Sequence, residues 1–166
     1  MKIKTYSELR IEVLDEIQKA LSLVSSEDIE VLVDMLCSAE KVFFVGVGRV
    51  LLSLQAWVKR FNHLGISATY VGALNEPAIT ERDLLIVGSG SGETAIPVAI
   101  SKIAKKHGAK VVHIGSNAKS SVGGMADFFI RIPCRTKLNL EDEIDSKQPM
   151  SSLFEQCLFI LGDIIA

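Results

Sequence analysis

The sequence predicts a three-layer α/β/α sandwich around a five-stranded parallel sheet, in a single domain over residues 1–166. Five short apolar runs alternate with helical patterns, and glycine-rich turns follow the first and third runs. In addition, 48% of the residues are hydrophobic although only 6% are aromatic. Strands that alternate with helices form parallel β-α-β units with right-handed crossovers. Aliphatic side chains suit strands that helices cover on both faces.

Residues 1–39 predict a pair of helices separated by the polar residues 25–28. Ser26 is a candidate N-cap of the second helix, because a serine hydroxyl accepts hydrogen bonds from the first free N–H groups. The apolar residues at helical spacing in the second helix are Ile29, Leu32, Val33 and Leu36. We expect the apolar face of this pair to pack partly against another copy of the chain, giving a dimer or tetramer.

Residues 40–166 predict the α/β core and a C-terminal helix. β-branched, aliphatic and aromatic runs mark the five strands, which are residues 41–45, 68–71, 84–87, 110–114 and 128–132. Helices are expected from the first turn to about Leu64 and over residues 94–107, closed by Gly65 and Gly108. The remaining features are a weak helical turn over 119–126, a charged irregular segment over 134–149 and a final helix from Met150 to the end.

Two glycine-rich turns are expected to meet at one edge of the sheet. In a flavodoxin-like order 2-1-3-4-5, the first and third strands are neighbours and flank the switch point at which ligands bind. The turn after the first strand contains Gly48 and Arg49, and residues 89–94 follow the third strand. This convergence is stronger evidence than either turn alone, and we expect both turns to contribute to one phosphate site.

The turn from Ser89 to Thr94 carries the strongest functional signal in the chain. Glycines let the backbone approach a ligand, hydroxyls donate hydrogen bonds, and the start of the following helix favours an anion. The turn has neither the Gly-Lys-Ser/Thr of a Walker loop nor the Gly-x-Gly-x-x-Gly spacing. We therefore predict that Ser89, Ser91 and Thr94 bind a single phosphate monoester. Helix capping and a flexible turn are the alternative roles.

Two side chains are candidates for acid–base chemistry. Glu155 is the only charged residue between Lys147 and Asp163, and a carboxylate among apolar neighbours suits a general base near neutrality. A surface glutamate near the start of a helix, where the dipole favours negative charge, is the alternative. His63 lies in the last turn of a helix, so a catalytic role and a purely electrostatic role both stay open.

The composition argues against several functional classes. The net charge of −2 and the scattered basic residues argue against a nucleic-acid partner, and no apolar run approaches the length of a membrane span. The cysteines have no C-x-x-C spacing, and no cluster of histidines, cysteines or carboxylates has metal-ligand spacing. The first residues lack the apolar core of a signal peptide, so we expect a cytoplasmic protein.

Taken together, these motifs resemble the sugar isomerase (SIS) domain family, whose hallmark is Ser-Gly-Ser-Gly-x-Thr at a strand-to-helix turn. Within this family the chain is similar to the 6-phospho-3-hexuloisomerases. The segments that carry the likeness span nearly the whole chain and are residues 44–49, 60–65, 71–72, 77–79, 83–86 and 148–156. The His-Leu-Gly and Gln-Pro-Met…Phe-Glu elements in these segments favour the hexuloisomerase branch.

The resemblance implies an SIS-type fold and an activity. The activity is the interconversion of 3-hexulose 6-phosphate and fructose 6-phosphate through a cis-enediol, by a tetramer without a metal or redox cofactor. The implied phosphate ligands are the hydroxyls of Ser89, Ser91 and Thr94. Glu155 is the implied base, and His63 is the implied partner acid in its own or a neighbouring subunit's site.

The chain also departs from the family pattern. Val50 stands where the family usually has a serine after Gly-x-Gly-Arg, and Ser53 or backbone N–H groups are candidate replacements for that hydroxyl. Residues 72–77 replace a Gly-Glu-Thr-Thr-Pro-like loop, which leaves Glu76 as a candidate substitute for its glutamate. The chain is also shorter than expected at its carboxyl end.

An SIS isomerase for another sugar phosphate stays open, and so do two functions outside the isomerases. One is a phosphosugar-sensing module without turnover, which the Val50 and 72–77 departures favour and the presence of Glu155 and His63 opposes. The other is a flavodoxin-like mononucleotide binder, against which the scarcity of aromatic residues argues.

Overall fold

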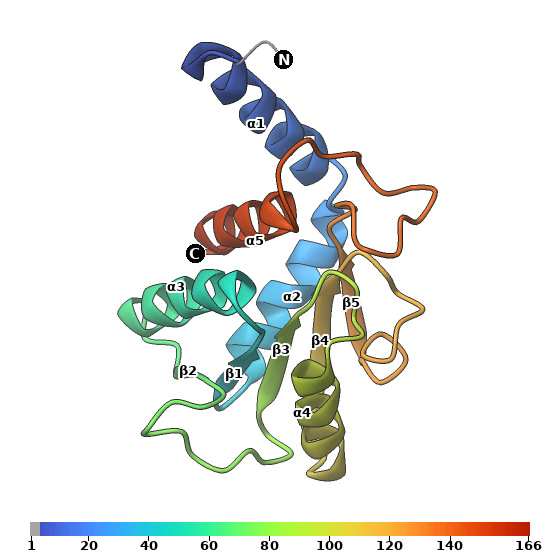
Figure 1. Ribbon diagram of the computed structural model, residues 1–166. Helices are drawn as coiled ribbons and strands as arrows, with labels where there is room; N and C mark the ends of the chain where they lie inside the picture. Colours follow the sequence, from blue (N-terminus) through green and yellow to red (C-terminus); the bar gives the residue numbers. More distant parts are fainter. Residues whose placement is uncertain (1–3) are drawn as a thin grey trace.

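The computed structural model describes residues 4–166, and a five-stranded sheet forms its centre (Figure 1). The strands are β1 (Val42–Val45), β2 (Ala68–Tyr70), β3 (Leu84–Gly88), β4 (Lys110–Gly115) and β5 (Phe128–Arg131). They are all parallel and lie in the order β2-β1-β3-β4-β5, which confirms the predicted topology. The carboxyl ends of β1 and β3 are therefore neighbours, with Val45 opposite Val87.

Helices cover both faces of the sheet. They are α1 (Tyr6–Leu21), α2 (Ser26–Ser38), α3 (Arg49–His63), α4 (Ala95–Lys106) and α5 (Ser152–Ile165). Successive strand residues point to opposite faces. In β1, Phe44 packs into the core shared with α2, α3 and α5, whereas Phe43 and Val45 pack into a second core with Ala104 of α4. The two cores establish the predicted three layers.

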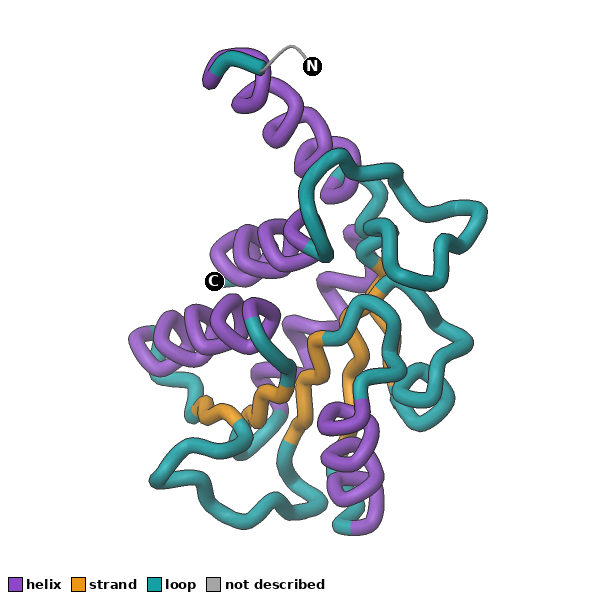
Figure 2. Tube along the Cα trace, in the orientation of Figure 1, coloured by secondary structure: helices purple, strands orange, loops and turns teal. Residues whose placement is uncertain are grey.

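The amino-terminal helix α1 projects away from the sheet (Figures 1 and 2). Only its carboxyl-terminal part packs closely, where Ala20 is fully buried. The apolar side chains of Tyr6, Leu9, Ile11 and Leu14 are exposed along the projecting part. Exposed apolar surface of this kind is typical of a protein–protein interface.

An aromatic cluster fixes α3 and α5 to each other and to the sheet. The ring centroids of Trp57 and Phe61 lie 5.7 Å apart, and Phe44 lies 6.0 Å from each of them. The indole Nε1–H of Trp57 donates to the Leu158 carbonyl at 2.7 Å. A Cβ at Gly162 would lie 2.1 Å from the same indole, so only glycine permits this approach of the two helices. Near their amino-terminal ends, α3 and α5 carry Arg49 and Glu155 respectively.

Two local predictions were wrong, and one was confirmed. Ser25, not Ser26, is the N-cap of α2, and its hydroxyl accepts the Asp28 N–H at 3.1 Å. Residues 119–126 form the predicted helical turn without a regular helix, since the N–H groups of Gly124 and Ala126 donate to the carbonyls of Ser120 and Val122 at 2.8 Å and 3.0 Å. The last helix begins at Ser152 because Met150 has a left-handed φ of 58°, which helical backbone does not adopt.

The length and hydropathy of the helices bear on the membrane prediction. Within residues 4–166, none of the helices combines the length and the apolar character that crossing a bilayer demands.

Candidate active site

A cavity of about 540 Å³ opens at the carboxyl ends of β1 and β3. Its walls come from the turns after these two strands, from residues 135–138 and from the beginning of α5. Four predicted site residues line it together, namely Ser89, Ser91, Thr94 and Glu155. The structure thus brings the predicted phosphate ligands and the predicted base to one cavity, at the switch point of the sheet.

The turn after β3 is compact and is held by its own hydroxyls. The Oγ atoms of Ser89 and Ser91 accept the N–H groups of Gly92 and Glu93 at 3.1 Å and 3.3 Å. Gly92 has a left-handed φ of 68°, and a Cβ there would lie 2.0 Å from the Ser120 hydroxyl. Because both serine hydroxyls act as acceptors in the turn, their O–H groups stay available as donors to a ligand.

Thr94 occupies the N-cap position of α4 without capping the helix. Its hydroxyl makes no capping hydrogen bond to the part of the chain that the structure describes, and the residue is exposed. The first N–H groups of a helix lack intrahelical partners and carry the positive end of the dipole. The helix-capping alternative therefore does not account for the Thr94 side chain, which is free to meet an anion at the start of α4.

Two side chains support the turn from behind. His113 in β4 is fully buried, and its Nε2 lies 2.9 Å from the Ser89 carbonyl. Burial lowers the pKa of His113, so the ring is neutral and its Nε2–H donates to that carbonyl. The Glu93 carboxylate accepts the hydroxyl of Ser121 at 2.6 Å and its N–H at 2.8 Å, and these two bonds lower the pKa of Glu93. His113 is thus a supporting residue that positions the turn.

Val50 fills the space between the two strand ends. An added Cβ at either Gly46 or Gly88 would lie 3.0 Å from the Val50 Cγ1 atom. The glycines therefore let α3 approach β1 and β3 closely, and the valine side chain lines the cavity where the family pattern has a hydroxyl. Ser53 does not replace that hydroxyl, since it is buried and donates to the Glu155 carbonyl at 2.9 Å.

Glu155 pairs with Arg49. The Arg49 Nε–H donates to the Glu155 carboxylate across the gap between α3 and α5. The Glu155 side chain is 13% exposed, whereas the Arg49 side chain is 65% exposed. Glu155 is thus a largely covered carboxylate at the cavity wall rather than a surface acid, and Arg49 orients it.

The remaining predicted residues lie around the cavity or away from it. Gly48 is the N-cap of α3 with a φ of 60°, beside the cavity-lining Val47. Arg49 pairs with Glu155 and does not line the cavity, and its contact with a phosphate stays a prediction. His63 is exposed at the other end of α3, about 20 Å along the helix from Arg49. His63 does not line the cavity of its own chain.

Residues 134–149 contribute to the site in a way that the sequence did not indicate. Thr136 packs over the turn after β3, since an added Cβ at Gly90 would lie 3.6 Å from the Thr136 methyl group. The Glu143 carboxylate accepts the Thr136 hydroxyl at 2.7 Å and the Leu140 N–H at 3.0 Å, which closes the segment on itself. Lys137 consequently lines the cavity. The polar composition of this segment was the only feature of the sequence that was compatible with a place at the site.

Glu76 accepts the Gly72 N–H at 2.7 Å and lies outside the cavity, so it does not replace the glutamate of the family loop at this site. Across residues 4–166, no three histidine, cysteine or acidic side chains are grouped so that they could hold a metal ion.

Comparison with known proteins identifies the family. The model of the SIS domain matches residues 35–160. The chain belongs to the SIS domain family. The 3-hexulose-6-phosphate isomerase of Bacillus subtilis is 35% identical over 154 residues, which cover 93% of this chain and 83% of that protein. The 3-hexulose-6-phosphate isomerase of Mycobacterium gastri is 35% identical over 92% of this chain and 76% of that protein.

Solved structures share the fold of this chain. The crystal structure of a hypothetical protein from Methanococcus jannaschii, for which a molecular function of 3-hexulose-6-phosphate isomerase was inferred, superposes with a TM-score of 0.81. That comparison has 27% identity and covers 95% of this chain and 86% of the other. The Vibrio vulnificus NanR protein complexed with ManNAc-6P shares the fold at a TM-score of 0.76, with 16% identity over 94% of this chain and 58% of NanR.

Proposed function

We propose that this chain is a phosphosugar isomerase that interconverts 3-hexulose 6-phosphate and fructose 6-phosphate. The observation that carries the proposal is the meeting of the Ser89–Thr94 turn and the Glu155 carboxylate in one cavity. It occurs in a chain that shares 35% identity with two 3-hexulose-6-phosphate isomerases over nine-tenths of its length. Hydroxyls at a helix start suit a phosphate monoester, and a covered carboxylate suits proton transfer.

The chemistry is a proton shift between two adjacent carbons. With the phosphate on the turn, Glu155 removes the proton from C2 of 3-hexulose 6-phosphate, and the C–H electrons form the C2=C3 bond of a cis-enediolate. The C2 hydroxyl passes its proton to the C3 oxygen, the protonated Glu155 returns its proton to C3, and C2 becomes the carbonyl carbon of fructose 6-phosphate. The reverse reaction begins at C3 of fructose 6-phosphate. Arg49 orients the Glu155 carboxylate for both transfers.

His63 requires a second copy of the chain to take part. Its place at the far end of α3 separates it from the cavity of its own chain, and its side chain is exposed. The exposed apolar residues of α1, together with Leu52 of α3 and Phe159 of α5, support an assembly of at least two copies. We propose a dimer or tetramer in which His63 serves as the acid for the neighbouring site.

Mixing two inactive variants tests this arrangement. If Glu155→Gln and His63→Asn are unfolded together and refolded, mixed assemblies regain intact sites only when the two residues come from different copies. About a quarter of the wild-type activity should then return for a two-fold arrangement. No recovery from a mixture that co-assembles would mean that His63 does not act across subunits.

The free cysteine thiols indicate the cellular compartment in which the protein acts. Cys37, Cys134 and Cys157 are free, with Cys37 exposed. Free thiols persist in reducing compartments, so we propose the cytoplasm as the site of action.

A direct assay tests the function. Wild-type protein incubated with fructose 6-phosphate should generate 3-hexulose 6-phosphate, which carbon NMR separates by the position of the ketone. Glu155→Gln, prepared in parallel, should bind inorganic phosphate as the wild type does and give no product. A wild type that binds fructose 6-phosphate without any conversion would instead support the phosphosugar-sensing alternative.

A further inference from the structure

The charges that face the cavity are unevenly compensated. Two carboxylates line it, Glu93 and Glu155, and two cations, Arg135 and Lys137. Glu155 is paired with Arg49, which lies just outside the lining. Glu93 is held by hydrogen bonds from Ser121 and keeps its negative charge next to the serine turn. A sugar phosphate that enters the turn therefore brings a dianion close to a carboxylate.

Of the two lining cations, Arg135 already has partners. Its Nη1–H donates to the Asp145 carboxylate at 2.9 Å, and its Nε–H donates to the Asn139 side chain at 2.8 Å. Lys137, in contrast, makes no hydrogen bond or ion pair with any residue between 4 and 166, and its side chain is exposed. Its ammonium group is the cation of the lining that is free to meet a ligand.

The backbone beneath Lys137 is held next to the serine turn. Thr136, its neighbour, packs over Gly90 in the middle of the Ser89–Ser91 sequence. Glu143 accepts both the N–H and the hydroxyl of Thr136, at 3.0 Å and 2.7 Å. The base of the segment is closed by the Arg135 N–H, which donates to the Ile144 carbonyl at 3.1 Å. Lys137 is therefore presented to the cavity by a locally fixed loop and not by a loose chain.

We propose that Lys137 supplies the positive charge for the phosphate group of the sugar, as a binding and specificity residue opposite the serine turn. The turn itself offers hydroxyls and N–H groups but no cation, and Val50 removes one hydroxyl that the family pattern would add. A lysine ammonium is a mobile point charge with three donors, which suits a phosphate monoester. The role in catalysis rests on the proposed isomerase function, whereas the role in phosphate binding does not.

The test compares charge removal with charge retention. Lys137→Met keeps most of the aliphatic stem, and we expect it to raise the KM for fructose 6-phosphate and the Kd for inorganic phosphate by about tenfold, with kcat nearly unchanged. Lys137→Arg should keep both constants within about threefold of wild type, because the charge stays. The difference between wild type and Lys137→Met should shrink at high salt.

Lys106→Met is the matched control, because Lys106 is an exposed lysine at the opposite end of α4 from the turn. It should leave KM and the phosphate Kd as in wild type. Unchanged KM and phosphate Kd in Lys137→Met would overturn the proposal, as would equal losses in the Lys106→Met control. If the wild type binds phosphate through Lys137 but converts no sugar, the isomerase function fails while the phosphate contact stands.

Discussion

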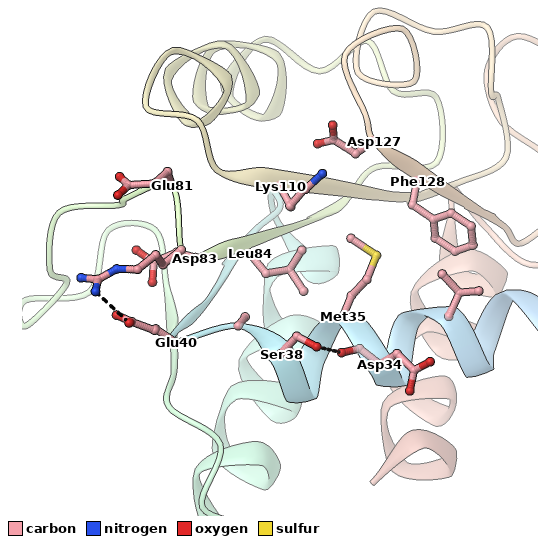
Figure 3. Close-up of a pocket in the computed structure, with 13 residues that line it drawn as sticks. Asp34, Met35, Ser38, Glu40, Glu81, Asp83, Leu84, Lys110, Asp127 and Phe128 are labelled. Atoms are coloured by element: carbon pink, nitrogen blue, oxygen red, sulfur yellow. Dashed lines mark hydrogen bonds and ion pairs between the residues drawn. The ribbon is translucent and has the colours of Figure 1, made fainter.

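The two ends of the same parallel sheet each carry a cavity, and the larger one is not the candidate active site. At the amino ends of β3 and β4, a cavity of about 710 Å³ lies between the strands and α2 (Figure 3). The cavity at the carboxyl ends of β1 and β3 measures about 540 Å³. Size alone would select the amino end of the sheet.

The two cavities differ in the charge of the side chains that line them. The amino-end cavity is lined by five carboxylates, Asp34, Glu40, Glu81, Asp83 and Asp127, and by two cations, Arg82 and Lys110. Its floor is apolar and includes Met35, Leu84 and Phe128 (Figure 3). An acidic rim of this composition disfavours a phosphate dianion. At the carboxyl end, two carboxylates face two cations and five hydroxyls.

Chain direction gives the physical reason for this difference. In a β-α-β unit the helix starts where a strand ends, so α3 and α4 point their amino ends at the carboxyl edge of the sheet. The partial positive charge of those helix ends favours an anion there. The same helices end near the amino edge, where the negative ends of their dipoles lie. An anion is therefore favoured at only one end of the sheet.

The largest effect is expected at Glu155. Glu155→Gln keeps the shape of the side chain and removes the proton acceptor, so turnover should fall by at least about 100-fold while the phosphate Kd barely changes. Steady-state kinetics and calorimetry measure the two quantities. A variant that isomerises nearly as fast as wild type would remove Glu155 from the chemistry and leave the family membership intact.

A loss of about tenfold in phosphate affinity is expected at the serine turn. Ser91→Ala removes a hydroxyl that can donate to the phosphate, and a charge-assisted hydrogen bond has a free energy near 1.5–3 kcal/mol. Calorimetry with fructose 6-phosphate checks this value. Equal affinity of Ser91→Ala and wild type would place the phosphate elsewhere in the cavity.

The converse variant, Val50→Ser, adds a hydroxyl between the two strand ends. It should tighten binding by a few-fold, less than a full hydrogen bond, because the lost methyl groups also loosen the packing around Gly46 and Gly88.

His113 predicts a pH dependence of stability at the carboxyl end. Burial lowers the pKa of His113, while a histidine in the unfolded chain has a pKa of about 6.5. Below that pH the unfolded chain takes up a proton that the folded chain does not, so the free energy of unfolding should fall between about pH 7.5 and pH 5.5. His113→Gln removes this titration and should show a smaller fall in chemical denaturation. Equal falls in both proteins would mean that His113 is not the titrating group.

The smallest effect is expected at the amino-end cavity. Lys110→Met, at the start of β4, removes a cation from that lining and should leave kcat/KM within about twofold of wild type. A fall comparable to that of Ser91→Ala would show that the acidic cavity participates in catalysis and would break the contrast between the two ends.

The sequence predicted those parts of the molecule that depend on local pattern. The strand order followed from the alternation of strands and helices, and the turn at Ser89 was visible as glycine and serine between a buried strand and a helix. These features need only neighbouring residues and the handedness of β-α-β units.

Contacts between distant residues could not be predicted in this way. Arg49 and Glu155 are paired across 106 positions of sequence, and the sequence did not predict this ion pair. The segment that carries Lys137 is fixed in part by Glu16 of α1, whose carboxylate accepts the Ser146 hydroxyl at 2.6 Å and the Lys147 N–H at 2.8 Å. No local periodicity records such bonds, because they form only once the helices have packed.

Proton exchange at carbon tests the central claim most directly. In the proposed reaction, the Glu155 carboxylate in the carboxyl-end cavity removes a proton from C3 of fructose 6-phosphate. In deuterated water, wild type should replace the C3 proton with deuterium, seen as loss of that proton signal by NMR, even where little product accumulates. Glu155→Gln should retain the signal, and Lys110→Met should lose it at the wild-type rate. A wild type that binds fructose 6-phosphate and leaves the C3 proton in place would contradict the account.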